Sequence, residues 1–310
     1  MTQLQDEFKS VDLNQPTVLT VGVFDGVHLG HQALLMETVK QAKGLGFASG
    51  VVTFTGHPRL VLGKHTELPH LTSVDQRIKL IKSVGIEHVI CLTFSKELAE
   101  LSAEQFIRLL INHCSMRGLV VGPDFALGRD RMGNAEVLKQ LGLSKGFSVT
   151  TVLPKTVKGF NISSTLIRQA MALSDMQMVH ELLGRCFTLE GQVIKGEGRG
   201  TDLGIPTANM AIADDQALPA DGVYASKAII DGKYFPSITN IGTRPTFGPG
   251  NRTVETHILD FTARLYDDIL EIAIIDQIRP EIKFESAEAL RSQIKVDISK
   301  AQTILAKAEC

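Results

Sequence analysis

The chain has 310 residues, of which 44% are hydrophobic and 21% are charged, a composition typical of folded globular proteins. Its 32 basic and 34 acidic side chains leave a net charge of −2, which argues against nucleic acid or an acidic membrane surface as a partner. The length favours two domains, and no apolar run approaches the roughly 20 residues that a membrane-spanning helix needs.

The first ten residues are polar and include acidic side chains, unlike a signal peptide. The four cysteines show no C-x-x-C spacing, which argues against a zinc ribbon or a redox motif. Scattered cysteines are typical of a reducing compartment. We therefore expect a cytoplasmic protein.

Residues 17–183 alternate short apolar segments with amphipathic ones. Strands are predicted at 17–23, 47–54, 88–94, 119–122 and 147–153. Helices are predicted at 31–43, 75–84, from Ser102 onward and at 135–141, and Ser102 with Gln105 fits a capping box. Because apolar strands alternating with amphipathic helices indicate parallel β-α-β units, we predict an α/β domain with a Rossmann-like parallel sheet.

Beyond Gly184 the pattern changes to consecutive strands. They are predicted at 187–193, 222–230, 235–241, 253–259 and 269–278, and a long helix is predicted only at 286–306. Turn residues such as Asp231-Gly232 separate several of the strands. The pattern indicates an antiparallel β-barrel with a terminal helix. We therefore predict two domains, 1–184 and 185–310.

The segment from Gly22 to His31 joins the first predicted strand to the first predicted helix. In an open parallel sheet, ligands bind at such carboxyl ends of strands. Glycines 22, 26 and 30 allow a ligand to approach the backbone closely, and a helix N-terminus attracts phosphate. His28 and His31 lie three residues apart, so both can face one phosphate and stabilise the charge that grows as its phosphorus is attacked.

Two other interpretations of the histidines are a plain strand-to-helix turn and a metal-binding pair. A metal site would need a third Cys, His or acidic ligand, and none stands at an obvious spacing. The preceding strand, the Phe24-Asp25-Gly26 turn and the following helix together favour a nucleotidyl-transfer site.

Two further segments follow predicted strands at the same edge of the sheet. Asp124 lies in the loop after the fourth strand. Ser164 begins a helix after the fifth strand, where a hydroxyl is often only a helix cap. Arg168, one turn further on, can bind a phosphate through two hydrogen bonds. Both segments are candidate parts of the same site.

A glycine-rich loop at residues 196–204 lies among the predicted barrel strands. It lacks the spacing of a dinucleotide-binding fingerprint and the lysine of a P-loop. The loop leads into Thr207 and Asn209, whose hydroxyl and amide oxygens are hard ligands suited to Mg²⁺ bridged to ATP phosphates.

These motifs resemble the bacterial bifunctional riboflavin kinase/FAD synthetase family, and the first resembles, more distantly, the H-x-G-H nucleotidyltransferases. The first domain carries Phe24-Asp25-Gly26-Val27-His28-x-Gly30-His31 and Ser163-Ser164-Thr165-x-x-Arg168. The second carries Pro206-Thr207-Ala208-Asn209 and the segments 218–224, 240–246 and 252–257, which are similar to the riboflavin kinase barrel. The order of the motifs is preserved along the chain.

The resemblance implies an enzyme that phosphorylates riboflavin to FMN in the barrel and adenylylates FMN to FAD in the first domain. Both steps would use ATP and Mg²⁺, and the second would release pyrophosphate. Glu255 would be the general base for the riboflavin hydroxyl, and His28 and His31 would act on the ATP phosphates. The other implied binding residues are Gly22, Phe24, Asp25, Asp124, Ser164, Thr165, Arg168, Gly198 and Gly200, with Thr207 and Asn209 as metal ligands.

The sequence departs from the family at Ala126 and Asn161, where members often carry basic residues. One alternative is therefore a riboflavin kinase with a weakened adenylyltransferase domain. Two others are a flavin-binding module without turnover and a nucleotidyltransferase for another acceptor. The predicted partners are the small molecules riboflavin, FMN and ATP, and the sequence sets no oligomeric state.

Overall fold

The computed structural model describes residues 3–11, 13–56, 63, 69–196, 200, 204–243 and 252–308. Contacts between residues divide the chain into two compact units, residues 1–163 and 164–310. The predicted boundary after Gly184 lies further along the chain, and it stays a prediction.

The first unit is built on a five-stranded parallel sheet with the strand order β3-β2-β1-β4-β7. Its strands are β1 (Thr17–Val21), β2 (Ala48–Phe54), β3 (His88–Leu92), β4 (Met116–Val121) and β7 (Ser148–Thr151). The predicted Rossmann-like α/β fold of this part of the chain is confirmed. Each predicted strand exists, with ends that differ by at most a few residues.

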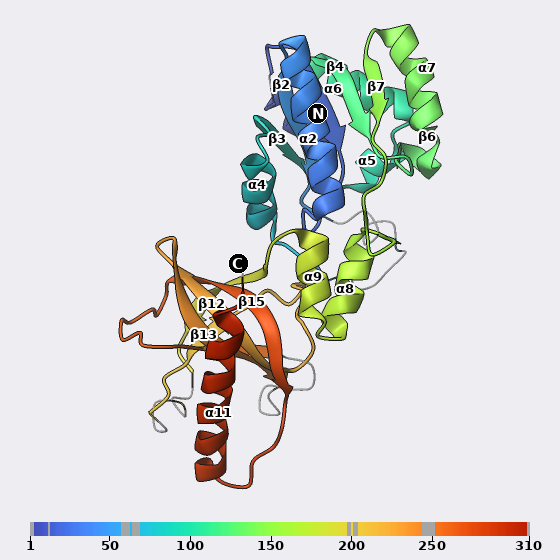
Figure 1. Cartoon of the computed structure of the whole chain (residues 1–310). Helices are drawn as coiled ribbons and strands as arrows, with labels where there is room; N and C mark the ends of the chain where they lie inside the picture. Colours follow the sequence, from blue (N-terminus) through green and yellow to red (C-terminus); the bar gives the residue numbers. More distant parts are fainter. Residues whose placement is uncertain are drawn as a thin grey trace. The chain divides into compact units, whose positions relative to one another are not determined.

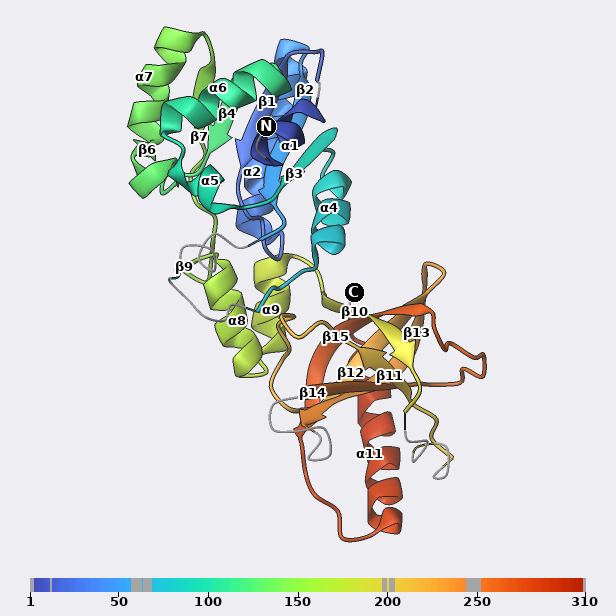
Figure 2. The ribbon, with the colours of Figure 1, turned by 180° about the vertical axis from the view of Figure 1, so that it is seen from behind.

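Helices cover both faces of this sheet. Helices α2 (Leu29–Leu45) and α4 (Val74–Ser83) lie in front of it in Figure 1, and α1 (Gln3–Lys9) and α6 (Ala103–Cys114) lie in front of it in the opposite view of Figure 2. The remaining helices are α5 (Lys96–Glu100) and α7 (Ala135–Lys145). The capping box predicted at Ser102 and Gln105 is confirmed at the start of α6.

The two faces of the sheet follow from the period-two alternation of a strand. Leu19 and Val21 of β1 pack into the core that also contains residues of α1 and α6. Val18, on the other face of β1, packs against Ala42 of α2 and Val120 of β4. The near-continuous burial of β1 is the pattern expected for a central strand of a parallel sheet.

The topology fixes where a ligand site can form. Strand β1 pairs with β2 on one side and with β4 on the other, so the chain changes direction across the sheet between β1 and β4. Ligands of open α/β sheets bind at the carboxyl edge beside such a switch point. The loops after β1 and β4, which carry Gly22–His28 and Asp124, therefore leave the sheet next to each other.

Short elements complete the first unit beyond β4. Strands β5 (Ala126–Leu127) and β6 (Gly133–Asn134) pair with each other around the 3-10 turn η1 (Arg129–Arg131). Strands β8 (Thr156–Val157) and β9 (Phe160–Asn161) form a hairpin.

The second unit contains a closed antiparallel barrel with the strand order β10-β11-β14-β13-β12-β15. The strands are β10 (Phe187–Ile194), β11 (Ala208–Ala211), β12 (Gly222–Ile230), β13 (Lys233–Thr243), β14 (Arg252–Ile258) and β15 (Ile269–Pro280). Asp231 and Gly232 both have positive φ angles in the turn between β12 and β13, as a two-residue hairpin turn requires. The predicted barrel is confirmed.

The predicted terminal helix is also confirmed, as α11 (Ala287–Leu305), which packs against β12, β13 and β15. Ala301 of this helix is fully buried against Ala225 and Ile238 of the barrel. Two shorter helices, α8 (Ser164–Ala172) and α9 (Met176–Leu183), precede the barrel. The Ala220 N–H donates to the Met171 carbonyl over 3.1 Å, which ties the end of α8 to the barrel.

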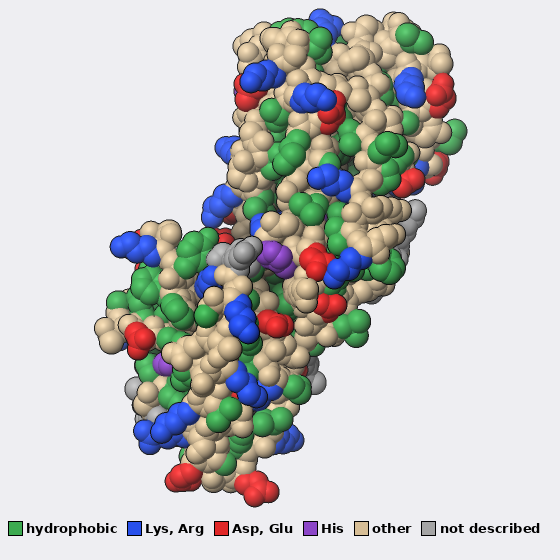
Figure 3. All heavy atoms as spheres, viewed as in Figure 1, with side chains coloured by type: hydrophobic (Ala, Val, Ile, Leu, Met, Phe, Trp, Pro, Cys, Tyr) green, Lys and Arg blue, Asp and Glu red, His purple; other side chains and the backbone are tan. Residues whose placement is uncertain are grey.

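Three features of the molecular surface and of its thiols bear on the sequence expectations. On the face seen in Figure 3, acidic and basic side chains are interspersed. No helix among the described residues is long and apolar enough to cross a membrane. Cys91 and Cys114 are free thiols.

Candidate active sites

The loop after β1 adopts an unusual backbone conformation. Phe24, Gly26 and Val27 have φ angles of 54°, 80° and 39°, in the left-handed region that disfavours side chains with a Cβ atom. Phe24 and Val27 are nevertheless at most 2% exposed, because both pack into a core with Leu35 of α2 and Val51 of β2. Burial of the two side chains thus offsets the backbone strain, and strain of this kind is concentrated at functional sites.

Asp25 fixes the same loop from the other side. Its side chain is 2% exposed, and its Oδ1 atom accepts hydrogen bonds from the N–H groups of Leu71 (2.9 Å) and Thr72 (3.2 Å). The Thr72 hydroxyl in turn accepts from the Gly26 N–H over 3.1 Å. Asp25 therefore holds the loop against the segment that leads into α4. Its predicted contact with a nucleotide stays a prediction.

His28 is the N-cap residue of α2. Its Nδ1 atom accepts a hydrogen bond from the His31 N–H over 3.2 Å. One of the backbone N–H groups that we expected to bind phosphate at the start of α2 therefore donates to this side chain instead. Because Nδ1 accepts, the proton of a neutral His28 ring lies on Nε2. The cap therefore fixes the tautomer of the His28 ring.

The two histidines lie together, as their spacing predicts. Their rings stack with centroids 3.6 Å apart and planes 15° apart, and the Phe24 ring meets His31 edge-on at 5.2 Å. A Cβ atom on Gly30 would lie only 3.2 Å from the His28 ring, and one on Gly22 would lie 3.1 Å from the Phe24 ring. Glycine at these two positions therefore makes room for the aromatic cluster.

The ring of His31 is buried in a way that lowers its pKa. The Nδ1 atom is buried and has no hydrogen-bond partner among the described residues. Burial, followed by repulsion from His28 and from Arg77, holds the pKa of His31 well below 6.5. His31 is therefore neutral at pH 7, which allows its ring to stack on that of His28.

The other predicted residues of this site lie in separate segments. Asp124 is exposed in the loop after β4, where its carbonyl accepts from the Arg131 guanidinium over 3.0 Å. Ala126 and Asn161 lie in the short strands β5 and β9. Ser164 and Thr165 form the first turn of α8, and Arg168 lies one turn further along it.

The barrel brings its predicted site residues into one row across three strands. Asn209 of β11 pairs directly with Glu255 of β14, and Glu255 pairs with Asn240 of β13. Side chains at directly paired positions lie about 4.5–5.5 Å apart at Cβ. The next residues along β13 and β14, Thr239 and Thr256, are fully buried and share a 3.0 Å hydrogen bond. The pleat thus separates a functional face from a packed one.

Gly200 lies close to Thr207, next to the row of Asn209, Glu255 and Asn240. The Ile205 N–H donates to the Gly200 carbonyl over 2.8 Å, and a Cβ on Gly200 would lie 3.2 Å from Thr207 Oγ1. The Pro206 carbonyl accepts from Nδ1 of His257 over 2.7 Å, which anchors the segment that carries Thr207. Gly198 lies outside the described residues, so its predicted role stays a prediction.

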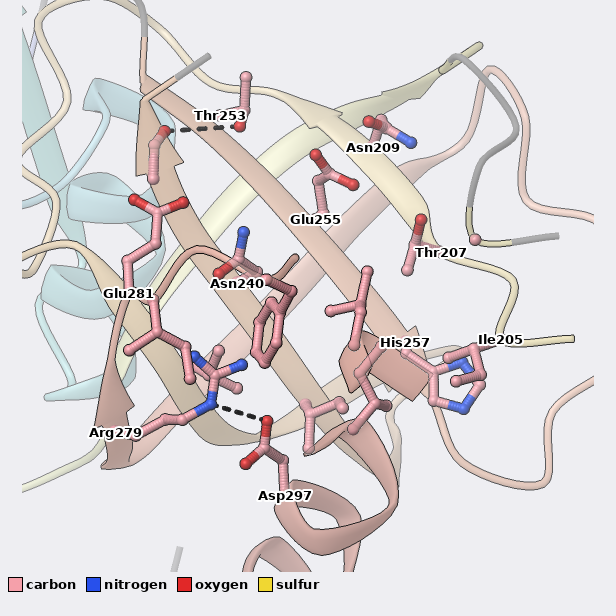
Figure 4. A pocket seen from close by; sticks show the side chains of 18 of the residues that line it. Ile205, Thr207, Asn209, Asn240, Thr253, Glu255, His257, Arg279, Glu281 and Asp297 are labelled. Atoms are coloured by element: carbon pink, nitrogen blue, oxygen red, sulfur yellow. Dashed lines mark hydrogen bonds and ion pairs between the residues drawn. The ribbon is translucent and has the colours of Figure 1, made fainter. Parts of the chain in front are cut away.

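One cavity of about 390 Å³ lies between the barrel and α11, and its lining includes Gly200, Thr207, Asn209, Asn240, Glu255 and His257. Figure 4 shows Glu255, Asn209 and Thr207 on one side of the cavity and Arg279 with Asp297 on another. The lining also includes Ile238, Ile282, Phe284, Leu290 and Ile294. A polar row beside an apolar wall suits a ligand with a polar chain and a flat apolar ring.

An ion pair closes the wall of the cavity that α11 provides. Arg279 Nε donates to Asp297 Oδ2 over 2.9 Å, and the Asp297 side chain is only 1% exposed. Asp297 also accepts from Gln293 over 2.9 Å, and the Arg279 guanidinium lies over the Phe284 ring at 5.5 Å. The pair therefore joins β15 to α11 and orients an aromatic ring of the lining.

A second carboxylate, Glu281, also lines the cavity. Burial, then repulsion from Asp221, raises the pKa of Glu281 against the opposing effects of Arg279 and Arg252. A Cβ on Gly242 would lie 2.6 Å from a Glu281 carboxylate oxygen. The glycine of the Asn240-Ile241-Gly242 motif thus leaves space for this carboxylate.

The motif at 218–224 is held in place by its own hydrogen bonds. The Tyr224 hydroxyl donates to the Ala220 carbonyl over 2.6 Å, and Ser174 bonds the same hydroxyl at 2.8 Å. Arg252 Nε donates to Asp221 over 2.8 Å. The motif therefore braces the start of β14, the strand that carries Glu255.

Sequence reasoning missed Arg77, Arg279, Glu281 and Asp297. A usable signal was present for two of them, because Arg77 lies four residues before the buried Ile81 and Asp297 four residues before the buried Ala301. A charged residue on the apolar face of a predicted helix indicates a buried partner or a site.

Comparisons with known proteins agree with this architecture. The family model for FAD synthetase matches residues 10–166, and that for riboflavin kinase matches residues 183–305. A bifunctional riboflavin kinase/FMN adenylyltransferase of Pseudomonas fluorescens is 37% identical over 291 residues, which cover 93% of each chain. The protein of that name from Escherichia coli (strain K12) is 34% identical over 282 residues, or 90% of each chain.

One solved structure extends the likeness to both units. It is described as a macrolide-efflux protein from Streptococcus pneumoniae and is 31% identical to this chain. The match covers 95% of this chain and 96% of that one, with a TM-score of 0.88.

The fold and the two domain matches define a transferase with two catalytic domains on one chain. The chain belongs to the bifunctional riboflavin kinase/FMN adenylyltransferase family. Because both the FAD synthetase model and the riboflavin kinase model match the chain, the alternative of a riboflavin kinase alone is not favoured.

Proposed function

We propose that the chain phosphorylates riboflavin in the barrel cavity and adenylylates the resulting FMN at the loop after β1, with ATP as the donor in both steps. The observation that carries the proposal is the row of Asn209, Glu255 and Asn240 along the wall of a cavity large enough for a small ligand. Riboflavin, FMN, FAD and ATP are then the substrates and products. A cytoplasmic location stays a prediction.

In the kinase step, Glu255 accepts the proton of the riboflavin 5′-hydroxyl. The hydroxyl oxygen then forms a bond to the γ-phosphorus of ATP, and the bond between that phosphorus and ADP breaks. A carboxylate positioned for such a proton transfer contributes about 10²–10⁴-fold to a rate. The direct pairing of Glu255 with two asparagines on neighbouring strands supports this role, because both strands restrict where its carboxylate can lie.

Mg²⁺ fits the oxygens of Thr207 and Asn209. A hydroxyl and an amide carbonyl are hard ligands of the kind that magnesium accepts together with substrate phosphates and waters. Gly196 and Gly200 leave the space beside them open, since a Cβ on either would lie within 3.2 Å of the Asn209 or Thr207 side chain. The ion would neutralise phosphate charge, while Thr207 and Asn209 hold it near the reacting group.

In the adenylyl-transfer step, a phosphate oxygen of FMN forms a bond to the α-phosphorus of ATP, and pyrophosphate leaves. The helix cap occupies Nδ1 of His28, so the ring nitrogen that would donate to a phosphate oxygen is Nε2. The stacked His31 lies beside it. Fixed donors aimed at growing charge lower the barrier without reorganisation. For Ser164, Thr165 and Arg168, the proposal rests on their sequence motif alone.

A chromatographic assay of flavin products tests the proposal. The full chain is incubated with ATP, Mg²⁺ and riboflavin, and in a second reaction with FMN in place of riboflavin. We expect FMN followed by FAD in the first reaction and FAD in the second. A folded protein that forms neither product would refute the proposal, and so would undiminished turnover after the divalent metal is chelated with EDTA.

The variant Glu255→Gln separates the two steps. It keeps the size of the side chain and removes the base, so FMN formation should fall by about 10²–10⁴-fold while FAD formation from supplied FMN persists. Glu288→Gln, an exposed position in the first turn of α11, serves as the matched control. Equal FMN formation by both variants would exclude Glu255 as the base.

A further inference from the structure

Helix α4 contains a buried arginine that packing alone does not explain. Arg77 is 1% exposed, although helix arginines normally keep their charged end in water. Its NH1 group donates to the Phe54 carbonyl over 2.8 Å, and its Nε atom is buried without a hydrogen-bond partner among the described residues. Burial of a charge with incomplete hydrogen bonding opposes folding. Arg77 is therefore a candidate for a functional role.

The surroundings of Arg77 belong to the adenylyl-transfer loop. Phe54 is the last residue of β2, so the guanidinium sits at the carboxyl edge of the sheet. Burial lowers the pKa of Arg77, and the negative charge of Asp25 opposes this effect. Asp25 is also the residue that binds the N–H groups of Leu71 and Thr72 just before α4. Arg77 and Asp25 are thus parts of one arrangement that joins α4 to the loop.

The same guanidinium acts on the histidine pair. Burial is the largest cause of the lowered pKa of His31, and the charges of His28, from the cap of α2, and of Arg77, from α4, lower it further. Two stacked imidazolium rings 3.6 Å apart would repel each other strongly. A positive charge that adds to the effect of burial on His31 therefore helps to preserve the stacking. It also favours negative charge on a phosphate at the pair.

We propose that Arg77 is a positioning residue for adenylyl transfer, which holds the end of β2 beside the β1 loop and supplies a buried positive charge that acts on Asp25 and His31. The inference rests on the proposed assignment of adenylyl transfer to His28 and His31. The guanidinium touches neither reactant in this scheme, so its effect is transmitted through the histidine and the loop.

The experiment uses the full chain with Arg77→Met, Arg77→Lys and a control, Arg108→Met. Arg108 is an exposed arginine of α6 that pairs with Glu104 in the same unit. FAD formation from FMN is measured against pH, and FMN formation from riboflavin in the same preparation monitors the barrel. We expect Arg77→Met to lower kcat for FAD formation by about 100-fold, the loss typical of a reacting geometry displaced by 1 Å.

A readout that a purely structural role would not move is the titration of His31, followed by NMR of the labelled imidazole. Loss of the positive charge should raise the pKa of His31 toward its ordinary value and move the acid limb of kcat/KM for FAD formation to higher pH. Arg77→Lys keeps the charge, so it should leave the His31 titration close to that of the wild type. It also provides the test if Arg77→Met does not fold.

Two outcomes distinguish the inference from the assignment on which it rests. His31→Gln is assayed in the same series, and full FAD formation by this variant would refute the assignment of the site. If His31→Gln is inactive but Arg77→Met keeps FAD formation within twofold of Arg108→Met, Arg77 has no positioning role. An equal shift of the His31 titration in Arg77→Lys and Arg77→Met would also overturn the electrostatic part.

Discussion

The two units place their candidate catalytic groups in different ways. In the first unit, His28 caps a helix and follows a loop with three residues in left-handed conformations, so its position depends on local backbone geometry and on glycines. In the barrel, Asn209, Glu255 and Asn240 lie on regular strands, and the register of those strands alone makes them neighbours.

The difference shows which perturbations each site should resist. The row of Asn209, Glu255 and Asn240 should tolerate changes beside it as long as the strand register and the covering helix persist. Each of these residues lies on a strand that is hydrogen-bonded to a neighbour on both sides. A loop site built on strained residues depends on each buried contact that offsets the strain. Variants that affect one product and spare the other test this comparison.

The largest expected effect is on the helix that covers the barrel cavity. Asp297→Ala leaves Arg279, whose side chain is only 14% exposed, without its carboxylate partner, which should destabilise the unit by about 3–5 kcal/mol. FMN formation should fall with it, while FAD formation from supplied FMN remains. Urea unfolding followed by circular dichroism measures the change, with Lys295→Ala, an exposed site on the same helix, as control. Equal unfolding midpoints for both variants would contradict the prediction.

The next test displaces one member of the strand row. A Cβ on Gly196 would lie 2.3 Å from the Asn209 amide nitrogen, so Gly196→Ala must push this side chain away by roughly 1 Å, a displacement that can cost about 100-fold in rate. The ladder between β11 and β14 should persist. We expect kcat for FMN formation to fall and FAD formation from FMN to stay unchanged. Unaltered FMN formation would show that Asn209 is not needed at this position.

The corresponding change in the first unit is Gly30→Ala. The added Cβ would lie 3.2 Å from the His28 ring, and the stacking of His31 on that ring restricts its movement. FAD formation should fall by about 10-fold, less than for a full 1 Å displacement. Gly44→Ala, in the same helix with nothing within 4 Å of the new Cβ, is the matched control. If the two alanines have the same effect, glycine at position 30 does not make room for His28.

The same contrast explains how far sequence reasoning reached. The strands of the parallel sheet and the long barrel strands were predictable because each is an apolar or alternating run in its own right. Strand β11 was not, since Ala208–Ala211 has no β-branched residue and forms only through pairing with β10 and β14. The proximity of Asn209 to Glu255 is a product of that pairing, and only family resemblance pointed to it in advance.

Prediction of the first site was limited by a different cause. The spacing of His28 and His31 correctly indicated that the two rings meet, because a helix start brings such positions to one side. The use of Asp25 to bind Leu71 and Thr72 joins residues 46 and 47 positions apart, and no local pattern encodes it. The charge on the buried face of α4 was visible as a break in the apolar pattern, but its partners were not.

The smallest expected effect concerns the change of the unfolding free energy with pH, to which His31 and Glu281 should contribute with opposite signs. The folded-state pKa of His31 lies below its ordinary value of 6.5, so the unfolded chain binds a proton first as the pH falls. His31 therefore lowers the free energy of unfolding as the pH drops below 6.5. Glu281 has a raised pKa, so the folded state holds its proton longer. The stability that Glu281 contributes is present at low pH and is lost as the pH rises through its folded-state pKa.

Unfolding by urea between pH 4.5 and 7.5 can separate the two contributions. His31→Gln should flatten the rise of unfolding free energy with pH, because it removes a group that the unfolded state protonates more readily. Glu281→Gln should steepen the same rise, because it removes a group that the folded state protonates more readily. His113→Gln, at the end of α6 and away from both sites, provides the background for a change of histidine. Changes of slope with the same sign for His31→Gln and Glu281→Gln would show that burial does not dominate the titration of both groups.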